Sequence, residues 1–344
     1  MDQNLVFAHF TPVLALVLDI LVGDPRWLPH PVAGLGRIAF WWERFARPLT
    51  GLDRGAAAGL AGAVGVVLLV CFSGGAAWYI SGLEYVGPLA GLYLAWSGLA
   101  LGSLLREVHA AFRTVETGTL PEARAAVSML VSRDTSAMEA PALRQSLAET
   151  LAENLNDGLV APFFYLVLLG PGGLWAYKAV STLDSMWGYR TPEYERFGKV
   201  AARTEDILAF IPARLTALAM VAAAVVAGPV GPHPGRVSRV LRGVWRDARK
   251  TPSPNAGWPM AAAAWIFGAP MGGGAVYFGR WVSKPVLGPV LAPDTSAQTG
   301  GAEPCGPWSR ERCVGLLRLC FVAGVGICLA MHLAGMAVRG ELGV

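Results

Sequence analysis

The fold is decided by residues 149–178, which read ETLAENLNDGLVAPFFYLVLLGPGGLWAYK. Carboxylates recur every four residues at Glu149, Glu153 and Asp157, so a helix carries all three on one face. The amide of Asn154 lies beside this stripe. Like charges at such a spacing repel, and we expect something cationic to face them. An acidic stripe next to apolar segments is typical of a metal ion, a cationic substrate or shifted pKa values.

The apolar run that follows is short. Leu159 to Leu169 cannot cross a hydrocarbon core of about 30 Å before Gly170-Pro171-Gly172-Gly173 interrupts it. Irregular backbone is tolerated at membrane depth where protein buries it, so we predict a re-entrant hairpin. The alternative, a full crossing, would place Lys178 to Asp206 on the side opposite the carboxylates. Residues 256–279 are also broken by Gly and Pro, and the same half-buried arrangement is open to them.

The rest of the chain is strongly apolar. Hydrophobic residues make up 54% of its 344 residues and charged residues only 15%, and the mean hydropathy is +0.46. Such values exceed those of soluble domains and predict a membrane protein. The candidate membrane spans are Leu5 to Val22, Ala56 to Ile80, Val86 to Leu105, Leu215 to Val230 and Val314 to Met336.

We therefore predict an all-α fold: a polytopic integral membrane protein with broken or re-entrant helices. The polar segments between the spans are too short for separate domains, so residues 1–344 are expected to form one integral domain. Within it, residues 106–157 are predicted to be a cytoplasmic helical insert, and residues 132–214 a polar catalytic block. The first apolar stretch lacks a basic n-region and a cleavage site, so we expect it to stay as an anchor.

Basic residues set the expected orientation. Residues 24–55 contain five Arg, residues 106–150 five Arg, and residues 230–254 six Arg or Lys, whereas the turn 81–87 contains none. By the positive-inside rule the turn and the N-terminus face outward, and the Arg-rich segments face the cytoplasm. The sequence thus predicts a multi-pass protein of the cell (inner) membrane with a cytoplasmic active site.

Cysteines and histidines indicate no metal or redox centre. Four of the five cysteines lie in or beside apolar helices and Cys305 lies in a Pro/Gly loop, so core packing is favoured over a metal or redox role. The five histidines are scattered, and the sequence contains neither a Walker loop nor a dinucleotide fingerprint.

Several polar residues outside the stripe have both a structural and a functional interpretation. Lys178 and Asp184 lie within two helical turns; a surface ion pair is possible, but their apolar flanks favour function. Arg203 and Arg214 lie on either side of a proline break, and guanidinium groups there suit phosphate or carboxylate, although Arg214 alone could merely snorkel.

Six strings occur in order along the chain: Gly-Asp-Pro-Arg-Trp-Leu-Pro-His-Pro (23–31), Ser-Arg-Asp-Thr-Ser (132–136), Glu-Thr-Leu-Ala-Glu-Asn-Leu-Asn-Asp-Gly (149–158), Tyr-Lys-Ala-Val-Ser-Thr-Leu-Asp-Ser-Met (177–186), Ile-Pro-Ala-Arg-Leu-Thr (211–216) and Ser-Pro-Asn-Ala-Gly-Trp-Pro (253–259). Together they closely resemble the CobD/CbiB family, the adenosylcobinamide-phosphate synthases of cobalamin biosynthesis. The resemblance runs from about Leu18 to Gly279.

This resemblance implies a reaction. The free propionate carboxylate of adenosylcobyric acid would be joined to the amine of aminopropanol, or of its O-phosphate, in an ATP-dependent amide ligation that gives adenosylcobinamide (phosphate). The implied cofactors are ATP and Mg²⁺, and the corrinoid is the substrate. The lipid bilayer and other membrane corrinoid enzymes are the further partners expected, and no nucleic acid is among them.

The residues can be given roles in that chemistry as a hypothesis. Mg²⁺ prefers carboxylates together with waters and phosphates, and the stripe supplies carboxylates. Asp134 or Asp184 would deprotonate the attacking ammonium, and Lys178 with the arginines would neutralise phosphate. The catalytic candidates are Asp134, Glu149, Glu153, Asn154, Asp157, Lys178 and Asp184, with Glu149, Glu153 and Asp157 as hypothetical Mg²⁺ ligands. The candidates for substrate or phosphate binding are Asp24, His30, Arg133, Arg203, Asp206, Arg214 and Asn255.

Two other classes of function stay open. Broken helices around a polar cluster are also typical of a transporter, here of a corrinoid or small anion. Transporters usually show internal symmetry, which this sequence lacks. A non-catalytic scaffold for other corrinoid enzymes would leave the acidic stripe unexplained.

The orientation can be tested by labelling single cysteines in intact cells. A cysteine in the 81–87 turn should react with an impermeant external reagent, and a cysteine at Glu139 should react only after the membrane is opened. External labelling at Glu139 alone would reverse the predicted topology.

Overall fold

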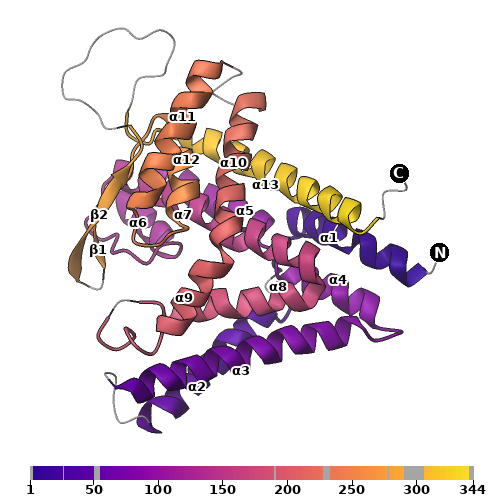
Figure 1. The fold of residues 1–344 in the computed structure, drawn as a ribbon. Helices are drawn as coiled ribbons and strands as arrows, with labels where there is room; N and C mark the ends of the chain where they lie inside the picture. Colours follow the sequence, from indigo (N-terminus) through magenta and orange to yellow (C-terminus); the bar gives the residue numbers. More distant parts are fainter. Residues whose placement is uncertain are drawn as a thin grey trace. The chain divides into compact units, whose positions relative to one another are not determined.

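The computed structural model describes residues 3–25, 27–49, 55–189, 191–227, 233–277, 279–289 and 306–340. The chain is mostly helical (Figure 1). Within the described residues, five helical segments are long and apolar enough to cross a membrane: Ala56–Ser81, Gly87–Thr117, Ala140–Trp187, Phe210–Ala227 and Arg310–Val338. A shorter apolar helix covers His9–Leu21. The predicted helical, multi-pass membrane protein is confirmed.

The chain divides into two compact units, each built from separate stretches of sequence. Unit 1 comprises Met1–Ser103, Asp157–Pro212 and Cys328–Val344. Unit 2 comprises Leu104–Asn156 and Ala213–Ile327. Neither unit is one contiguous stretch, and a single integral domain stays a prediction.

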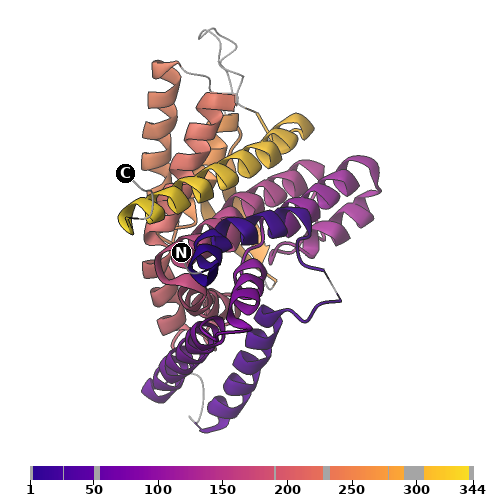
Figure 2. The same ribbon diagram turned by 90° about the vertical axis from the view of Figure 1, so that its right-hand side faces the viewer.

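Unit 1 is built on helix α3. The helices with most of their length in this unit are α1 (Gln3–Leu21), α2 (Pro31–Leu49), α3 (Ala56–Ser81), α4 (Gly87–Ser97), α8 (Ala161–Trp187) and α9 (Lys199–Leu208). α3 packs along α8, and α2 lies beside α3 in both views (Figures 1 and 2). A Cβ on Gly74 would lie 3.1 Å from the carbonyl oxygen of Gly172, so small residues let α3 and α8 approach closely.

The helical structure is interrupted between α4 and α5 (Leu101–Thr117), and a residue of α1 caps the start of α5. The first N–H groups of a helix have no partner within it. The buried carboxylate of Asp19 takes two of them: its Oδ2 accepts hydrogen bonds from the N–H groups of Leu101, at 2.8 Å, and Gly102, at 3.2 Å. The N–H of Ala100 donates to the carbonyl of Gly158 at 2.9 Å. The irregular segment thus has hydrogen-bond partners inside the protein.

Helix α8 turns back on itself at Gly170. This residue has φ 67° and ψ −164°, a conformation open essentially to glycine. A straight helix would separate Tyr165 from Tyr177 by about 18 Å, yet their rings stack with centroids 5.2 Å apart. A Cβ on Gly173 would lie 3.0 Å from the carbonyl oxygen of Tyr165. The break predicted at these glycines is confirmed, and the re-entrant position in the membrane stays a prediction.

Unit 2 combines helices with a β-hairpin that the sequence analysis did not predict. Its further elements are α6 (Leu120–Ser128), α7 (Ala140–Leu155), α10 (Phe210–Ala227), α11 (Pro234–Asp247), a 3₁₀ turn (Ala248–Lys250), α12 (Gly257–Phe267), β1 (Met271–Tyr277), β2 (Arg280–Leu287) and most of α13 (Arg310–Val338). β1 and β2 pair antiparallel. The signal was Gly279 between Val276-Tyr277 and Trp281-Val282, pairs of β-branched and aromatic residues.

The carboxylate of Asp247 joins α11 to α12 and β2. It is fully buried and pairs with Arg246 at 2.9 Å and Lys250 at 2.6 Å. It also accepts hydrogen bonds from the indole of Trp265 and the backbone N–H of Gly288. Burial alone would raise the pKa of Asp247, but these bonds outweigh burial and lower it strongly. This carboxylate is therefore a structural anchor of unit 2.

Other predictions from the sequence fared differently. The predicted insert is helical, although residues 129–139 interrupt it, and its cytoplasmic side stays a prediction. Cys313, Cys320 and Cys328 are buried, as core packing predicts. Cys71 is exposed on α3, so core packing is wrong for it. Cys305 lies outside the described residues.

The reversal at Gly170 yields a stability prediction with a matched control. A Cβ has open space at both Gly170 and Gly75, but only Gly170 has positive φ. Gly170→Ala should lower the free energy of unfolding by about 1–3 kcal/mol through backbone strain. Gly75→Ala, inside helix α3, should raise it by up to about 1 kcal/mol. Thermal unfolding of both variants in the same detergent measures the difference, and equal stability would contradict the conformation at Gly170.

Candidate functional sites

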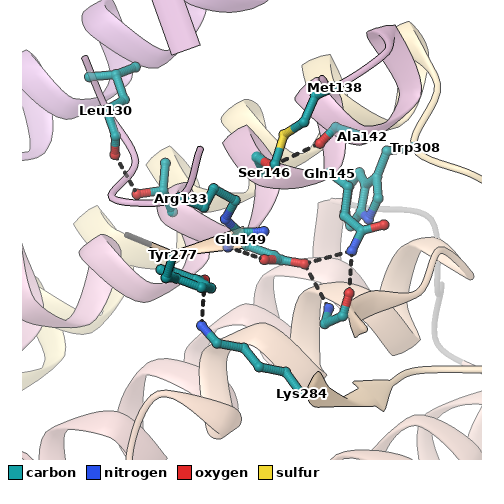
Figure 3. Close-up of polar contacts among 12 residues, drawn as sticks. Leu130, Arg133, Met138, Ala142, Gln145, Ser146, Glu149, Tyr277, Lys284 and Trp308 are labelled. Atoms are coloured by element: carbon teal, nitrogen blue, oxygen red, sulfur yellow. Dashed lines mark hydrogen bonds and ion pairs between the residues drawn. The ribbon is translucent and has the colours of Figure 1, made fainter. Parts of the chain in front are cut away.

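The first carboxylate of the stripe, Glu149, is held in a buried network within unit 2 (Figure 3). Its Oε2 accepts a hydrogen bond from Arg133 Nη2 at 2.5 Å. Its Oε1 accepts bonds from the side chain of Gln145 at 2.8 Å and from the backbone N–H of Gly272 at 2.7 Å. Both oxygens are engaged, so Glu149 joins the loop before α7 to strand β1.

Arg133 is the cation that the acidic stripe requires. Burial would lower the pKa of its guanidinium, but the charges of Glu149, Tyr277 and Glu153 and the bond to Glu149 raise it above its ordinary value. Tyr277 is held in turn by Lys284, whose Nζ donates to the phenol oxygen at 2.6 Å. These bonds give the buried carboxylate of Glu149 a structural role, and its catalytic role stays a prediction.

The three carboxylates of the stripe lie in different surroundings. Glu149 is buried, Glu153 is exposed and Asp157 is half-buried. α7 ends at Leu155, and a π-helical turn, Asn156–Val160, changes the helical register just before Asp157. Asp157 belongs to unit 1 and the other two to unit 2. The common face was predicted for a regular α-helix, and the π-helical turn interrupts that regularity before Asp157.

The donor set does not fit magnesium at Glu149. Across the described stretches, no group of three His, Cys, Asp or Glu side chains is placed to hold a metal ion. Both oxygens of Glu149 already accept hydrogen bonds from protein groups. The magnesium requirement itself stays a prediction.

The side chains of Asp134 and Asn154, also in unit 2, form hydrogen bonds with nearby backbone groups. The carboxylate of Asp134 accepts the backbone N–H of Ser136 at 2.8 Å, and this bond lowers the pKa of Asp134 and makes it a weaker base. The amide of Asn154 is exposed and donates to the carbonyl of Thr150 one turn earlier. Their catalytic roles stay predictions.

Arg214 and Asn255 come together in unit 2, as two predicted binding residues. Arg214 Nη1 donates to Asn255 Oδ1 at 3.3 Å, and its guanidinium lies 4.6 Å from the ring centre of Trp258. Arg249 lies near enough for charge repulsion and stacks on Trp245 at 3.9 Å. The sequence analysis did not identify Arg249, whose proximity to Arg214 joins residues distant in sequence.

In unit 1, the structure groups a different set of predicted residues. Asp24 Oδ2 accepts a hydrogen bond from Ser103 at 2.7 Å, and its Oδ1 lies 3.3 Å from His30 Nε2. Lys178, half-buried on α8, lies within electrostatic range of both Asp24 and Asp157. Among the described residues its ammonium forms no ion pair within 4.0 Å. Donor capacity is therefore available at Lys178.

The electrostatics keep Asp24 ionised. Burial would raise the pKa of Asp24, but hydrogen bonds from His30 and Ser103 and the charge of Lys178 outweigh it and lower that pKa. His30 Nδ1 lies 3.3 Å from the backbone N of Val32, so it accepts there and its Nε2–H donates to Asp24. The cluster thus combines a fixed carboxylate, an oriented imidazole and an ammonium.

The remaining predicted residues of unit 1 lie elsewhere in it. Asp184 packs near Gly188 at the end of α8. Arg203 and Asp206, on α9, line a pocket with the start of α3. Arg203 and Arg214 fall in different units, so their joint phosphate site stays a prediction.

Comparison with known proteins accounts for most of the chain. A protein-family model described as "CobD/Cbib protein" matches residues 12–301 of this chain. The chain belongs to the CobD/CbiB family. It is 42% identical over 296 residues to the cobalamin biosynthesis protein CobD of Geobacter metallireducens, covering 83% of this chain and 88% of that protein. Identity is 37% over 283 residues to CobD of Klebsiella pneumoniae, with coverage of 81% and 86%. No solved structure matches the chain.

A relative with the family's second name shows the same extent of similarity. The cobalamin biosynthesis protein CbiB of Salmonella choleraesuis is 37% identical over 280 residues, covering 80% of this chain and 85% of that protein. The six strings that carried the resemblance all lie within the matched residues.

Two site residues of this CobD/CbiB family member were missed by the sequence analysis. Gln145 lies one helical turn before Glu149, a spacing that could have indicated their contact. Ser103 gave no signal, because its approach to Asp24 depends on how α1 and α5 pack.

The network at Glu149 predicts a structural effect of mutation. Glu149→Gln removes the charge opposite Arg133, and loss of one partner of a buried pair costs about 3–5 kcal/mol of folding free energy. The exposed Glu153→Gln should change stability by less than about 0.5 kcal/mol. Thermal unfolding and turnover in detergent are measured for both. A Glu149→Gln protein that is fully stable but inactive would instead place Glu149 in the reaction.

Proposed function

We propose that this protein is an amide-forming carbon–nitrogen ligase of cobalamin biosynthesis, of the adenosylcobinamide-phosphate synthase type. It would join the free propionate carboxylate of adenosylcobyric acid to the amine of aminopropanol or its O-phosphate. Family membership and relatives named as cobalamin biosynthesis proteins support the pathway. The motif resemblance and the chemistry of unit 1 support the proposed reaction.

One observation carries the reaction: the cluster of Asp24, His30, Ser103 and Lys178, with Asp157 in electrostatic range. Amide formation requires a base, because an ammonium must lose a proton before its nitrogen can attack. It also requires a cation or donor for the negative charge that develops on the carbonyl oxygen. Two carboxylates within electrostatic range of an ammonium can supply both.

Each residue of the cluster is given one role in the proposed reaction. Asp24 is engaged by His30 and Ser103 and would serve as a fixed anchor. Asp157 would take the proton from the attacking ammonium, and Lys178 would stabilise the developing oxyanion. The new C–N bond forms as the C–O bond to the activated oxygen breaks. Asp157 keeps the first proton of the ammonium until solvent removes it, and the second proton leaves the nitrogen with the departing phosphate.

The carboxylate of the corrinoid is a poor acyl donor by itself. ATP, when bound, would supply the phosphoryl group that turns its oxygen into a leaving group. The cytoplasmic orientation expected from the Arg distribution would give the site access to ATP and the corrinoid from the cell interior. Other membrane enzymes that use corrinoids are the partners we expect there.

Growth of a deletion strain tests the function. Cells lacking the gene should fail to grow on cobyric acid and should recover on cobinamide, because the proposed step lies between the two compounds. Growth on both compounds, or on neither, would remove the proposal.

A membrane-fraction assay tests the residues. Lys178→Met should lower formation of the amide product by at least about 100-fold, which is about 2.7 kcal/mol in the barrier, since each 1.36 kcal/mol is tenfold. Lys284→Met, which removes an exposed lysine of β2, is the matched control and should keep its rate. Equal rates in the two variants would exclude a role for Lys178.

A further inference from the structure

A pocket of about 830 Å³ lies where α3 and α9 of unit 1 begin. Its walls come from Gly55 to Gly59, from the segment after α8 and from the first two turns of α9. Ligand pockets for small molecules typically enclose about 300–1,000 Å³. None of the clustered residues around Asp24 and Lys178 lines it, so it is a second site within the unit.

Three cationic side chains line this pocket. Lys199 and Arg203 are four residues apart on α9 and therefore share a face, and Arg196 precedes the helix. All three are exposed. Within the described ranges none of them forms an ion pair. Glu195 and Asp206 also line the pocket, and the net charge of these five side chains is positive.

Two helix N-termini add to the positive potential. α3 begins at Ala56 and α9 at Lys199, and both first turns line the pocket. The unpaired N–H groups and the dipole of a helix N-terminus favour anions. The backbone N–H groups of the helix N-termini and the cationic side chains therefore both favour an anionic ligand.

Tyr194, which lines the pocket, is fixed by contacts with its neighbours. Tyr194 donates its hydroxyl to Glu43 Oε1 at 2.9 Å, and Arg47 lies over its ring at 4.6 Å. Trp187 donates to the other oxygen of Glu43 at 3.0 Å. A Cβ on Gly198 would lie 1.7 Å from the Trp187 carbonyl oxygen, so only glycine lets this segment pack so closely. An ordered aromatic ring offers a stacking surface for a base.

We infer that this pocket binds a nucleoside triphosphate. Lys199, Arg203 and Arg196 pair with the phosphate oxygens, and the amides of the two helix N-termini donate to them. A monophosphate would leave most of these donors unused, whereas a triphosphate carries enough charge for all three cations. Asp206 suits the magnesium ion that accompanies such a ligand, because Mg²⁺ is commonly held by one or two carboxylates and substrate phosphates. The inference rests on the proposed function, which needs ATP, and adds its location.

The test is direct binding to the full chain purified in detergent. The probe is radiolabelled AMP-PNP with Mg²⁺, and inorganic tripolyphosphate is the competitor. The double variant Lys199→Gln/Arg203→Gln should bind AMP-PNP at least about tenfold more weakly than the unmodified chain, and Lys199→Arg/Arg203→Lys should bind within about threefold of it. The matched control Arg239→Gln/Arg242→Gln removes two exposed charges from α11 and should bind as the unmodified chain does. Unchanged thermal unfolding of the ligand-free variants establishes that they fold.

The outcomes separate this inference from the proposed reaction. Unchanged AMP-PNP affinity in the folded double variant would overturn the inference, even if the membrane assay yields amide product. Loss of affinity in that variant supports the inference, even if no amide product forms. Displacement of AMP-PNP by phosphatidylglycerol nanodiscs but not by tripolyphosphate would identify a lipid-headgroup site and also overturn it.

Discussion

The buried carboxylate of Asp19 is the interaction on which unit 1 depends. It lies in an apolar helix and accepts the first N–H groups of α5, which the break after α4 leaves without helical partners. In an apolar environment each unsatisfied backbone group costs several kcal/mol. One carboxylate from α1 therefore permits a helix to begin within the apolar region.

This cap also positions the candidate site. Asp19 holds the first two residues of α5, and Ser103 follows directly in the same turn. Asp24 follows Asp19 on the chain, just beyond the end of α1, and the two segments meet in the Ser103–Asp24 bond of 2.7 Å. The reversal at Gly170 then returns α8 so that Lys178 comes within electrostatic range of Asp24. The helix breaks are thus the reason that charged groups gather inside an apolar protein.

The sequence predicted the helices and their breaks because both are local properties. Apolar length predicts a span, and a Gly-Pro-Gly-Gly segment predicts a break, whatever surrounds them. The pairing of charges is not local. The four-residue spacing placed Glu149, Glu153 and Asp157 on one face, but the π-helical turn before Asp157 and the unpredicted strand that brings Gly272 to Glu149 decide their surroundings. The motif resemblance identified the family correctly. The four-residue spacing of the carboxylates did not predict which residues surround each of them.

The two kinds of charged group differ in how fully they are bonded. Glu149 and Asp247 use both carboxylate oxygens on protein donors, so a substrate would have to displace structural bonds to reach them. Lys178 on α8 and Lys199 on α9 have carboxylates near them without forming an ion pair among the described residues. A charge retained in an apolar protein costs free energy unless it is paired or used. Fully bonded charges such as Glu149 and Asp247 therefore serve stability. Charges without an ion pair, such as Lys178 and Lys199, are the better candidates for binding and catalysis.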